Sequence, residues 1–486
     1  MRLVAGSRGA LSFGKEGRGG LRGLILGAAV LALVLAGWGI YAALHPAWWV
    51  SYPVDLRVYW NGGLIARHAW PAYDKRLASP LYGWVSQEGL KFTYTPFAAV
   101  LFSVVSFVPW LVLPWLSELV NLAALGAAAW FTMAGLGCQG RRARAAAALA
   151  GTAAGLVTEP VFRTLFLGQI NLILMAVIVW DLTRPPIVRG DGRLVGLATG
   201  IAAGIKLTPL IFIPYLLLTR RLREAALATA GFLGCVAVGF VALPADSADW
   251  WLKGLFFQGG RTGFAGWGGN QSLFGLIIRL AGSISAAVPW WICAAVIVTV
   301  TGLASAAQLR RAGHPMLGIL ATATVGLLDS PISWDHHWVW VVPGVLVAGH
   351  YAARLAGRRR PGAAVGCLAV ALVLLLVTFC WPGGLWGVRT SGPGDFTTGL
   401  LWAAPSSPVR WYLLHGDQPS FLEYHWRGLQ VLAGNAYALA GLSVLAGLTA
   451  LALRTRLAER RITRAAAATP AAARVPQQRS GHSVRG

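Results

Sequence analysis

The sequence predicts an all-α, polytopic membrane protein, and three observations lead to this fold class. Of its 486 residues, 56% are hydrophobic and 12% are charged, and the mean hydropathy is +0.61, which leaves too little polar surface to cover a soluble globule of that size. Several apolar runs rich in Gly and Ala approach the roughly 20 residues that cross a hydrocarbon core about 30 Å thick. Arginines gather in short clusters between those runs, as the positive-inside rule describes.

The chain begins with a basic segment, residues 1–22, and continues with its clearest apolar run, residues 23–44. A cleaved signal peptide would have a shorter apolar stretch and a small-residue cleavage site. This run is full length and leads into Trp48 and Trp49, a pair that is typical of a membrane interface. We therefore expect it to be the first transmembrane helix.

The arrangement of charge predicts the topology. The net charge of +24 does not indicate a nucleic-acid-binding protein, because the arginines are divided among loops and do not form one soluble basic face. We assign the arginine clusters to the cytoplasm and the carboxylate-bearing segments between them to the outer side of the cytoplasmic (inner) membrane. Two of the outer loops are long, residues 45–92 and residues 382–430, which favours a functional site on the outer side.

The expected number of transmembrane helices is about eleven to thirteen. Residues 195–218 join two basic segments and would have to cross twice within too few residues, so Pro209 and Pro214 favour two short helices that meet near Lys206. Residues 95–136 look like two helices. The chain must pass from the outer side to the cytoplasm across this segment, which requires an odd number of membrane crossings. Residues 454–486 are rich in Ala and Arg and predict a basic, disordered cytoplasmic tail.

Asp55 stands about ten residues beyond the first predicted helix, close to the expected membrane surface. A carboxylate there can deprotonate a lipid-linked hydroxyl, and partial desolvation by the surrounding tryptophans would raise its pKa, which Arg57 would oppose. The alternative is an aspartate that caps a short interfacial helix.

Lys206 is one of five lysines in a chain that otherwise uses arginine, and it lies between two apolar stretches. A charge in such a place is a candidate functional residue. An ammonium can hold a phosphate, and the break at Pro209 would leave backbone groups available nearby. The alternative is a lysine that snorkels to the interface.

Residues 329–338 hold two aspartates and two histidines, among them Asp335, His336 and His337. Metal binding is one interpretation, although adjacent histidines do not form the i, i+4 pair of a zinc helix. Recognition of a phosphate or a sugar by one histidine is the second, and an interfacial cap without a catalytic role is the third.

Further polar groups lie at predicted outer helix ends and are typical of sugar-binding sites, although amides also bridge helices in membranes. They are Arg163 with Gln169 and Asn171, Asn270 with Gln271, and Tyr94. The sequence contains no Gly-rich phosphate loop, Walker motif, nucleophile elbow or DxD-like pair, which argues against the use of ATP or nucleotide sugars.

Taken in order, these motifs resemble glycosyltransferase family 87, the polyprenyl-phosphate-mannose-dependent alpha-1,2-mannosyltransferases of mycobacteria and their relatives. The resemblance runs along most of the membrane region, and one departure is Thr95, where the family pattern has a second proline. The motifs are Asp55 with Tyr59, Tyr94-Thr95-Pro96, Gly168-Gln169-Ile170-Asn171, Lys206-Leu207-Thr208-Pro209, Asn270-Gln271-Ser272 and residues 330–337.

The resemblance implies a GT-C type bundle in which residues 23–453 form a catalytic transmembrane domain. It implies inverting transfer of mannose, with Asp55 as the catalytic base, and it requires no cofactor and no divalent metal. The implied partners are membrane lipids, a polyprenyl-phosphate-mannose donor and a glycolipid acceptor, without nucleic acid. Donor-phosphate binding falls to Lys206, His336, His337 and Arg163, and sugar or acceptor binding to Tyr59, Tyr94, Gln169, Asn171, Asn270, Gln271, Trp334 and Asp335.

The sequence leaves two matters open. The acceptor can be a phosphatidylinositol mannoside or a lipomannan-type glycan, and the donor sugar can be mannose or another polyprenyl-linked sugar. The main alternative function is a secondary transporter or lipid flippase that uses the same polar residues. Transporters commonly show inverted repeats, and no second half of this chain matches the first.

Overall fold

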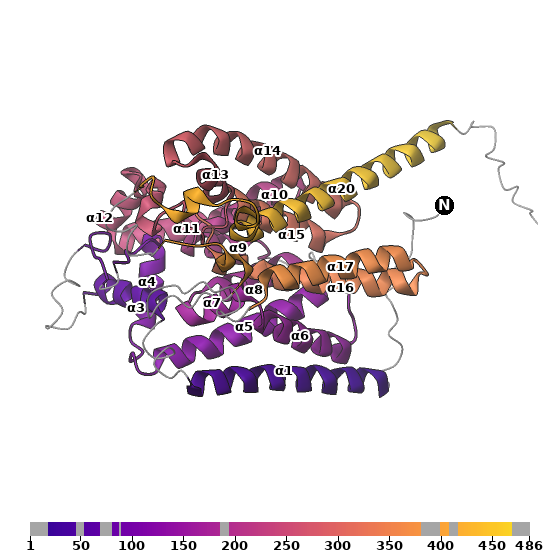
Figure 1. The fold of residues 1–486 in the computed structure, drawn as a ribbon, viewed down its shortest axis with the longest axis horizontal. Coiled ribbons are helices and arrows are strands. Elements are labelled where there is room, and N and C mark those ends of the chain that lie inside the picture. Colours follow the sequence, from indigo (N-terminus) through magenta and orange to yellow (C-terminus); the bar gives the residue numbers. More distant parts are fainter. Residues whose placement is uncertain are drawn as a thin grey trace, which may run out of the picture.

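The computed structural model describes residues 18–44, 53–68, 80–86, 89–184, 194–380, 399–407 and 417–468, which form helices joined by turns and loops (Figure 1). Within these ranges β-type pairing is limited to three isolated bridges, so the predicted all-α fold class is confirmed. Residues 1–17, 45–52, 69–79, 87–88, 185–193, 381–398, 408–416 and 469–486 lie outside the described residues.

Seven helices of the described ranges are long and apolar enough to cross a membrane, and an eighth crossing results if α7 and α8, bent by 117°, are one span. The chain is thus a multi-pass membrane protein, and the expected eleven to thirteen helices stay a prediction. The seven lie in α1 (Arg18–Leu44), α5 (Leu113–Gly135), α11 (Leu222–Ala242), α14 (Ile284–Arg311), η6 (Asp335–Trp340) with α16 (Val341–Gly357), α17 (Pro361–Thr378) and α20 (Ala436–Ala468).

Residues 95–136 form two helices, as expected, but they differ in length. Thr95 caps α4 (Pro96–Val105), since its Oγ1 accepts a hydrogen bond of 3.2 Å from the backbone N–H of Ala98. The ten residues of α4 span about 15 Å, half of a hydrocarbon core, whereas the 23 residues of α5 can cross it. By length and composition α5 alone is a candidate span, which agrees with the odd number of crossings that the charge pattern requires between the first long loop and the arginines at residues 141–144.

The predicted break at Lys206 is confirmed. The helix α9 (Leu197–Ile205) ends at Lys206, which is extended (φ −136°, ψ 129°), and the chain returns through η2 (Thr208–Ile211) and α10 (Phe212–Leu218). Pro209 lies in the first turn of η2, where its missing N–H costs no helical hydrogen bond. The two short arms form a hairpin with Lys206 at its tip.

The helix α15 (Pro315–Asp329) lies in the core, and twelve of its fifteen residues are buried. It packs against α14, α20, η2 and α8 (Asn171–Thr183). The remaining elements are α3 (Val54–Ala66), α6 (Arg141–Leu156), α7 (Glu159–Leu167), α12 (Pro244–Ser247), η3 (Ala248–Leu252), η4 (Leu255–Phe257), η5 (Gly259–Thr262), α13 (Leu273–Ala281), η7 (Leu400–Ala403), η8 (Leu422–His425) and α19 (Leu429–Gly434).

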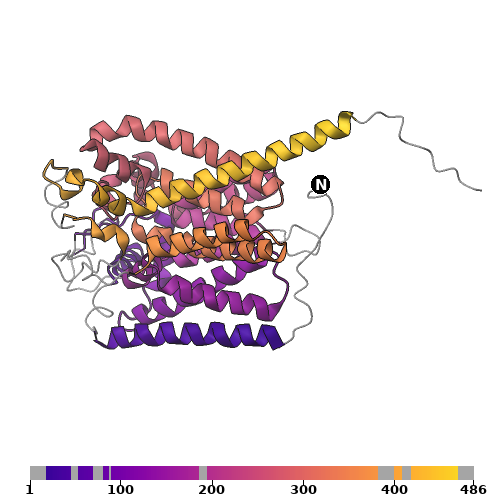
Figure 2. The same cartoon turned by 45° about the vertical axis from the view of Figure 1, so that its right-hand side comes forward.

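The helix α20 has 33 residues, about 50 Å, and is longer than a bilayer core is thick. Its C-terminal part leaves the bundle (Figure 2). The helix continues through residue 454, where the sequence predicts the start of a disordered tail, and ends at Ala468. The arginines at residues 454–464 therefore extend on a helix away from the bundle, at the end opposite to α3 and α4 (Figure 1).

Candidate active site

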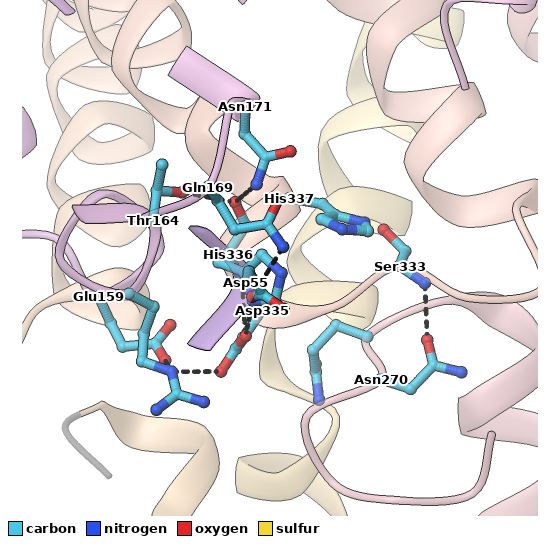
Figure 3. A network of polar contacts seen from close by, with 12 residues as sticks. Asp55, Glu159, Thr164, Gln169, Asn171, Asn270, Ser333, Asp335, His336 and His337 are labelled. Atoms are coloured by element: carbon cyan, nitrogen blue, oxygen red, sulfur yellow. Dashed lines mark hydrogen bonds and ion pairs between the residues drawn. The ribbon is translucent and has the colours of Figure 1, made fainter. Parts of the chain in front are cut away.

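Four segments that are distant in the sequence meet inside the bundle, and Figure 3 labels residues of α3, of the α7–α8 turn and of η6 among them. They are the first turn of α3, the turn between α7 and α8, the tip between α9 and η2, and the start of η6. These segments carry Asp55, Gln169, Lys206 and His336, respectively. Most of the residues that the sequence singles out are therefore brought together.

Gly168 makes the turn that brings Gln169 to α3. It ends α7 in the left-handed conformation, with φ at 68°, and α8 leaves at 117° to α7. A Cβ atom at this position would lie 2.6 Å from the Cβ of Leu56 in α3. Glycine alone combines a positive φ with so close an approach, so this residue determines where the following side chain lies.

Gln169 connects Asp55 to two tyrosines. Its Nε2 donates a hydrogen bond of 2.8 Å to Asp55 Oδ2, and its Oε1 accepts from the hydroxyls of Tyr59 at 2.7 Å and Tyr94 at 3.0 Å. Because an ionised carboxylate only accepts, the amide nitrogen must face Asp55 and the amide oxygen must face the tyrosine hydroxyls. The contact occupies Oδ2 of Asp55 and leaves Oδ1 for another partner.

Asp55 is half-buried, and its environment acts on its acidity in both directions. Burial is the largest influence and raises the pKa of Asp55 above its ordinary value. The nearby charge of His336 opposes this rise, as do the hydrogen bond from Gln169 and, more weakly, the charges of Lys206 and Arg163. A carboxylate with a raised pKa that is still stabilised in its ionised form suits a general base.

Lys206 joins the site from the tip of its hairpin. Its Nζ donates a hydrogen bond of 2.9 Å to Asn171 Oδ1 and lies 2.9 Å from His337 Nε2. An ammonium group has donors only, so His337 Nε2 must accept and carries no proton. Of the three ammonium protons, one remains for a ligand, and a compact cation with a free donor suits a phosphate oxygen.

The start of η6 is held by its backbone as well as by its side chains. The carbonyl oxygen of His336 accepts hydrogen bonds from Thr164 Oγ1 at 3.0 Å and from Asn171 Nδ2 at 2.9 Å. Asp335 Oδ1 lies 2.9 Å from His336 Nδ1, and Asp335 Oδ2 lies 3.3 Å from Arg163 Nε. Arg163 and Asp335 are thus partners of each other in the structure.

Asn270 lies apart from this group and joins two loops. Its Nδ2 donates to the carbonyls of Ala265 at 2.8 Å and Pro331 at 3.0 Å, and its Oδ1 accepts from the backbone N–H of Ser333 at 2.8 Å. The backbone of Asn270 also pairs with that of Trp334 in an isolated bridge. These contacts give the fully buried Asn270 a structural role, and sugar binding by Asn270 or Trp334 stays a prediction.

Gln271 has a similar environment. Its Nε2 donates to the carbonyls of Gly268 at 2.7 Å and Gly434 at 2.8 Å, and its Oε1 accepts from the backbone N–H of Tyr437 at 3.0 Å. The amide thereby satisfies a free N–H at the start of α20. Its predicted contact with a sugar is untested.

A pocket of about 50 Å³ lies beside Lys206, between α8, η2, α15 and η6. Its polar lining includes Asn171, Lys206 and His337, and most of its other walls are apolar. The apolar part of the lining includes Leu174, Met175, Ile178, Ile211, Phe212, Ala323 and Leu327. The pocket therefore offers an apolar volume next to a cation.

Comparison with known proteins identifies the family. Residues 92–331 match the family "Glycosyltransferase family 87". A Mycobacterium tuberculosis (strain H37Rv) protein named polyprenol-phosphate-mannose-dependent alpha-(1-2)-phosphatidylinositol mannoside mannosyltransferase is 33% identical over 368 residues, which cover 71% of this chain and 81% of that protein. The chain belongs to glycosyltransferase family 87. A second relative from that species (strain CDC 1551), named as the corresponding pentamannoside mannosyltransferase, is 34% identical over 379 residues, 74% of this chain and 81% of its own length.

The family 87 protein is therefore a glycosyltransferase and a multi-pass membrane enzyme, and the predicted resemblance is confirmed. Membership of this family favours an enzyme over the transporter or flippase alternative. No solved structure matches the chain significantly, so the geometry of the site is argued from this structure alone.

Within the described part of this glycosyltransferase, no group of three or more His, Cys, Asp or Glu side chains is arranged to hold a metal ion. The aspartate and histidines at residues 335–337 instead contact Arg163, Lys206 and backbone atoms. The expectation that the enzyme requires no metal stays a prediction.

Three residues of the transferase site escaped the sequence analysis as site residues. Glu159 is fully buried, and its oxygens accept hydrogen bonds from Trp402 Nε1 at 3.3 Å and Tyr437 Oη at 2.7 Å. The one available signal was local, because Glu159 stands four residues before Arg163 and its Oε1 lies 3.8 Å from Arg163 Nε. Trp402 and Tyr437 come from distant parts of the chain and carry no such signal.

Proposed function

We propose that the enzyme transfers mannose from a polyprenyl-phosphate-mannose donor to the 2-hydroxyl of a mannoside acceptor on a lipid-linked glycan. The acceptor is of the phosphatidylinositol mannoside or lipomannan type, and the product linkage is alpha-1,2. The observation that carries the proposal is the proximity of a half-buried carboxylate, Asp55, to the cation at Lys206, which acts electrostatically on it. The names of the two mycobacterial relatives support the donor, the acceptor class and the linkage.

The proposed reaction is a single inverting displacement. Oδ1 of Asp55, which Gln169 leaves unoccupied, accepts the proton of the acceptor 2-hydroxyl as its oxygen attacks the anomeric carbon of a beta-linked mannosyl phosphate lipid. The bond from that carbon to the phosphate oxygen breaks, and its electron pair leaves with the polyprenyl phosphate. The configuration inverts once, so the product is alpha-linked.

The leaving phosphate needs positive charge more than it needs an acid. Lys206 supplies a cation that Asn171 and His337 hold in a fixed orientation, each at 2.9 Å. The pocket of about 50 Å³ beside it suits the start of the donor's isoprene chain, since its walls are mostly apolar. The lipid chain and the phosphate would then bind side by side.

We place this chemistry at the outer side of the cytoplasmic membrane. The basic C-terminal half of α20 leaves the bundle at the end opposite to α3, which carries Asp55 (Figure 1). The positive-inside rule assigns the basic end to the cytoplasm. A donor with its own membrane anchor suits an outer site, because nucleotide sugars are absent there.

The test is a transfer assay with the purified enzyme in lipid nanodiscs, radiolabelled mannosyl phosphopolyprenol and a phosphatidylinositol mannoside acceptor. We expect radiolabelled product that an alpha-1,2-specific mannosidase releases, without any ion gradient. GDP-mannose in place of the lipid donor should give no product. Absence of transfer with every mannoside acceptor would overturn the proposal.

The matched variants are Asp55→Asn and Asp249→Asn. Asp249 is a suitable control because its side chain is 39% exposed and pairs with the exposed Lys253 on the surface. We expect Asp55→Asn to lower kcat by at least about 10²-fold, in the range of general-base catalysis, and Asp249→Asn to retain activity. A folded Asp55→Asn enzyme with full transfer would refute the assignment of the base.

A further inference from the structure

The ring of His336 has one nitrogen that the protein does not satisfy. His336 is 5% exposed, and among the described residues its Nε2 has no hydrogen-bond partner. A buried polar atom without a partner costs free energy unless a ligand supplies one. The charge of His336 also acts on Asp55. It lowers the pKa of Asp55 more than the charge of Lys206 or of Arg163 does.

The other nitrogen of the ring is fixed. Nδ1 lies 2.9 Å from Asp335 Oδ1, and the same oxygen accepts from the backbone N–H of His336 at 2.7 Å. A carboxylate oxygen accepts only, so Nδ1 carries a proton. Because Thr164 and Asn171 hold the backbone carbonyl of the same residue, the ring has a set orientation.

Asp335 is the carboxylate that contacts the ring of His336 from behind. Asp335 and Glu159 are both buried, and Arg163 lies between them, with its Nε 3.3 Å and 3.8 Å from their oxygens. Burial and the neighbouring Asp335 favour the neutral acid at Glu159. The negative charge therefore lies on Asp335, and its Oδ1, 2.9 Å from Nδ1 of His336, favours a second proton on the ring.

We propose that Asp335 is a positioning residue that holds His336 as an imidazolium, with its Nε2–H directed at the phosphate of the lipid donor. Arg163 and Glu159 hold Asp335 in place and do not contact substrate. His337 has the opposite state, because its Nε2 accepts from Lys206 and is therefore unprotonated. The inference rests on the proposed function and assigns different roles to the two adjacent histidines.

A charged His336 also affects the base. The groups that surround its ring are Asp335 and His337 on η6, Asp55 on α3, Arg163 and Glu159 on α7, and Lys206 at the hairpin tip. Of these, Asp55 depends on His336 to remain ionised, since its burial favours the neutral acid. Loss of the imidazolium charge would therefore move the acid limb of the kcat/KM profile to higher pH.

The kinetic test compares Asp335→Asn, His336→Gln and the double variant in the lipid-donor assay. We expect Asp335→Asn to lower kcat by about 10²-fold and to move the acid limb to higher pH. In the His336→Gln background the same change should add no further loss. Additive losses with an unshifted pH profile would indicate a merely structural Asp335 and overturn the proposal.

A spectroscopic test does not depend on turnover. Nitrogen NMR of enzyme labelled at histidine should show one residue with both ring nitrogens protonated near neutral pH, and His336→Gln should remove that signal. Asp335→Asn should convert the signal to a neutral ring, and Glu159→Gln, which removes no negative charge, should leave it in place. A neutral His336 in the unmodified enzyme would overturn the inference, even with full mannosyl transfer.

Thr164→Val is the structural control, because it removes a hydrogen bond to the same segment and leaves the charges intact. It should lower thermal stability while the imidazolium signal persists. An imidazolium signal in a protein without mannosyl transfer would support the inference and refute the proposed function, so the two are separable.

Discussion

The amide of Gln169 donates a hydrogen bond of 2.8 Å to Asp55 Oδ2. The orientation of that amide is not free, since two tyrosine hydroxyls donate to its oxygen. A single neutral side chain therefore stabilises the ionised form of the base and directs its second oxygen. The pKa of Asp55 should therefore respond to a substitution of Gln169, although Gln169 itself is uncharged.

Gln169→Glu should shift the pH dependence of catalysis. In the unmodified enzyme burial raises the pKa of Asp55, so kcat/KM falls as the pH drops through that raised value and the base becomes protonated. The variant replaces the amide donor by a second carboxylate beside Asp55, which raises the pKa of Asp55 further. We expect the acid limb to move to higher pH and kcat/KM near neutral pH to fall by about 10- to 10²-fold.

The pH profile of kcat/KM with lipid donor measures this effect. Gln430→Glu is the control, because Gln430 is exposed and accepts a hydrogen bond only from the backbone of Arg427. An acid limb that is identical in the unmodified enzyme and in Gln169→Glu would exclude Asp55 as the titrating base.

Replacement of Lys206 should act on the leaving group. Lys206→Met removes the cation and leaves Asn171 and His337 without their shared donor. We expect kcat to fall by about 10²- to 10³-fold, the range for loss of one donor that stabilises developing charge. Lys206→Arg keeps the charge, but its larger planar fork cannot direct three donors from one nitrogen as an ammonium does, so it should recover only part of the loss. Activity in Lys206→Met equal to that in Lys206→Arg would argue against a role for charge.

The apolar pocket predicts a dependence on the length of the donor chain. Ala323 is buried and lines the pocket, so Ala323→Leu fills part of it. We expect the KM for a polyprenyl donor to rise about 10-fold, while the KM for mannosyl phosphate that carries no isoprene unit changes little. Mannosyl phosphate serves as the control in the same protein. An equal increase for both donors would point to a distorted site and not to a filled lipid subsite.

Gly168→Ala should destabilise the enzyme more than the same change at Gly137. Both glycines have positive φ, at 68° and 82°, but a Cβ at Gly168 would meet Leu56 at 2.6 Å and one at Gly137 would meet nothing within 4 Å. The backbone strain of about 1–2 kcal/mol is common to both, so the difference reports the contact with α3. Thermal unfolding in detergent measures it. Equal thermal unfolding midpoints in the two variants would show that the contact between residue 168 and Leu56 does not affect stability.

The sequence predicts the residues of the site better than it predicts their partners. The break at Lys206 was accessible because two prolines and a charge are local signals. Asp55 could be singled out because its separation from the first predicted helix can be counted along the sequence. Neither prediction needed knowledge of which helices touch.

What the sequence does not reveal depends on contacts over long separations. The buried Glu159 meets Trp402 and Tyr437, which lie 243 and 278 residues further along the chain. Asn270 and Gln271 have the composition of a sugar site, yet their amide atoms are engaged by backbone groups that only the fold supplies. The topology prediction did not recognise that α4 is too short to cross a membrane, because an apolar run in the sequence shows hydrophobicity but not where the helix begins and ends.

The hairpin at Lys206 has a consequence for the lipid around it. The nine residues of α9 rise about 14 Å, roughly half the depth of a hydrocarbon core, and the chain then turns back. With the proposed outer-facing site, a donor phosphate that binds Lys206 would lie below the plane of the other headgroups, and the polyprenyl phosphate product would have to rise again to leave. The distance of that excursion is set by the bilayer as much as by the protein, so membrane thickness becomes one of the variables that govern turnover.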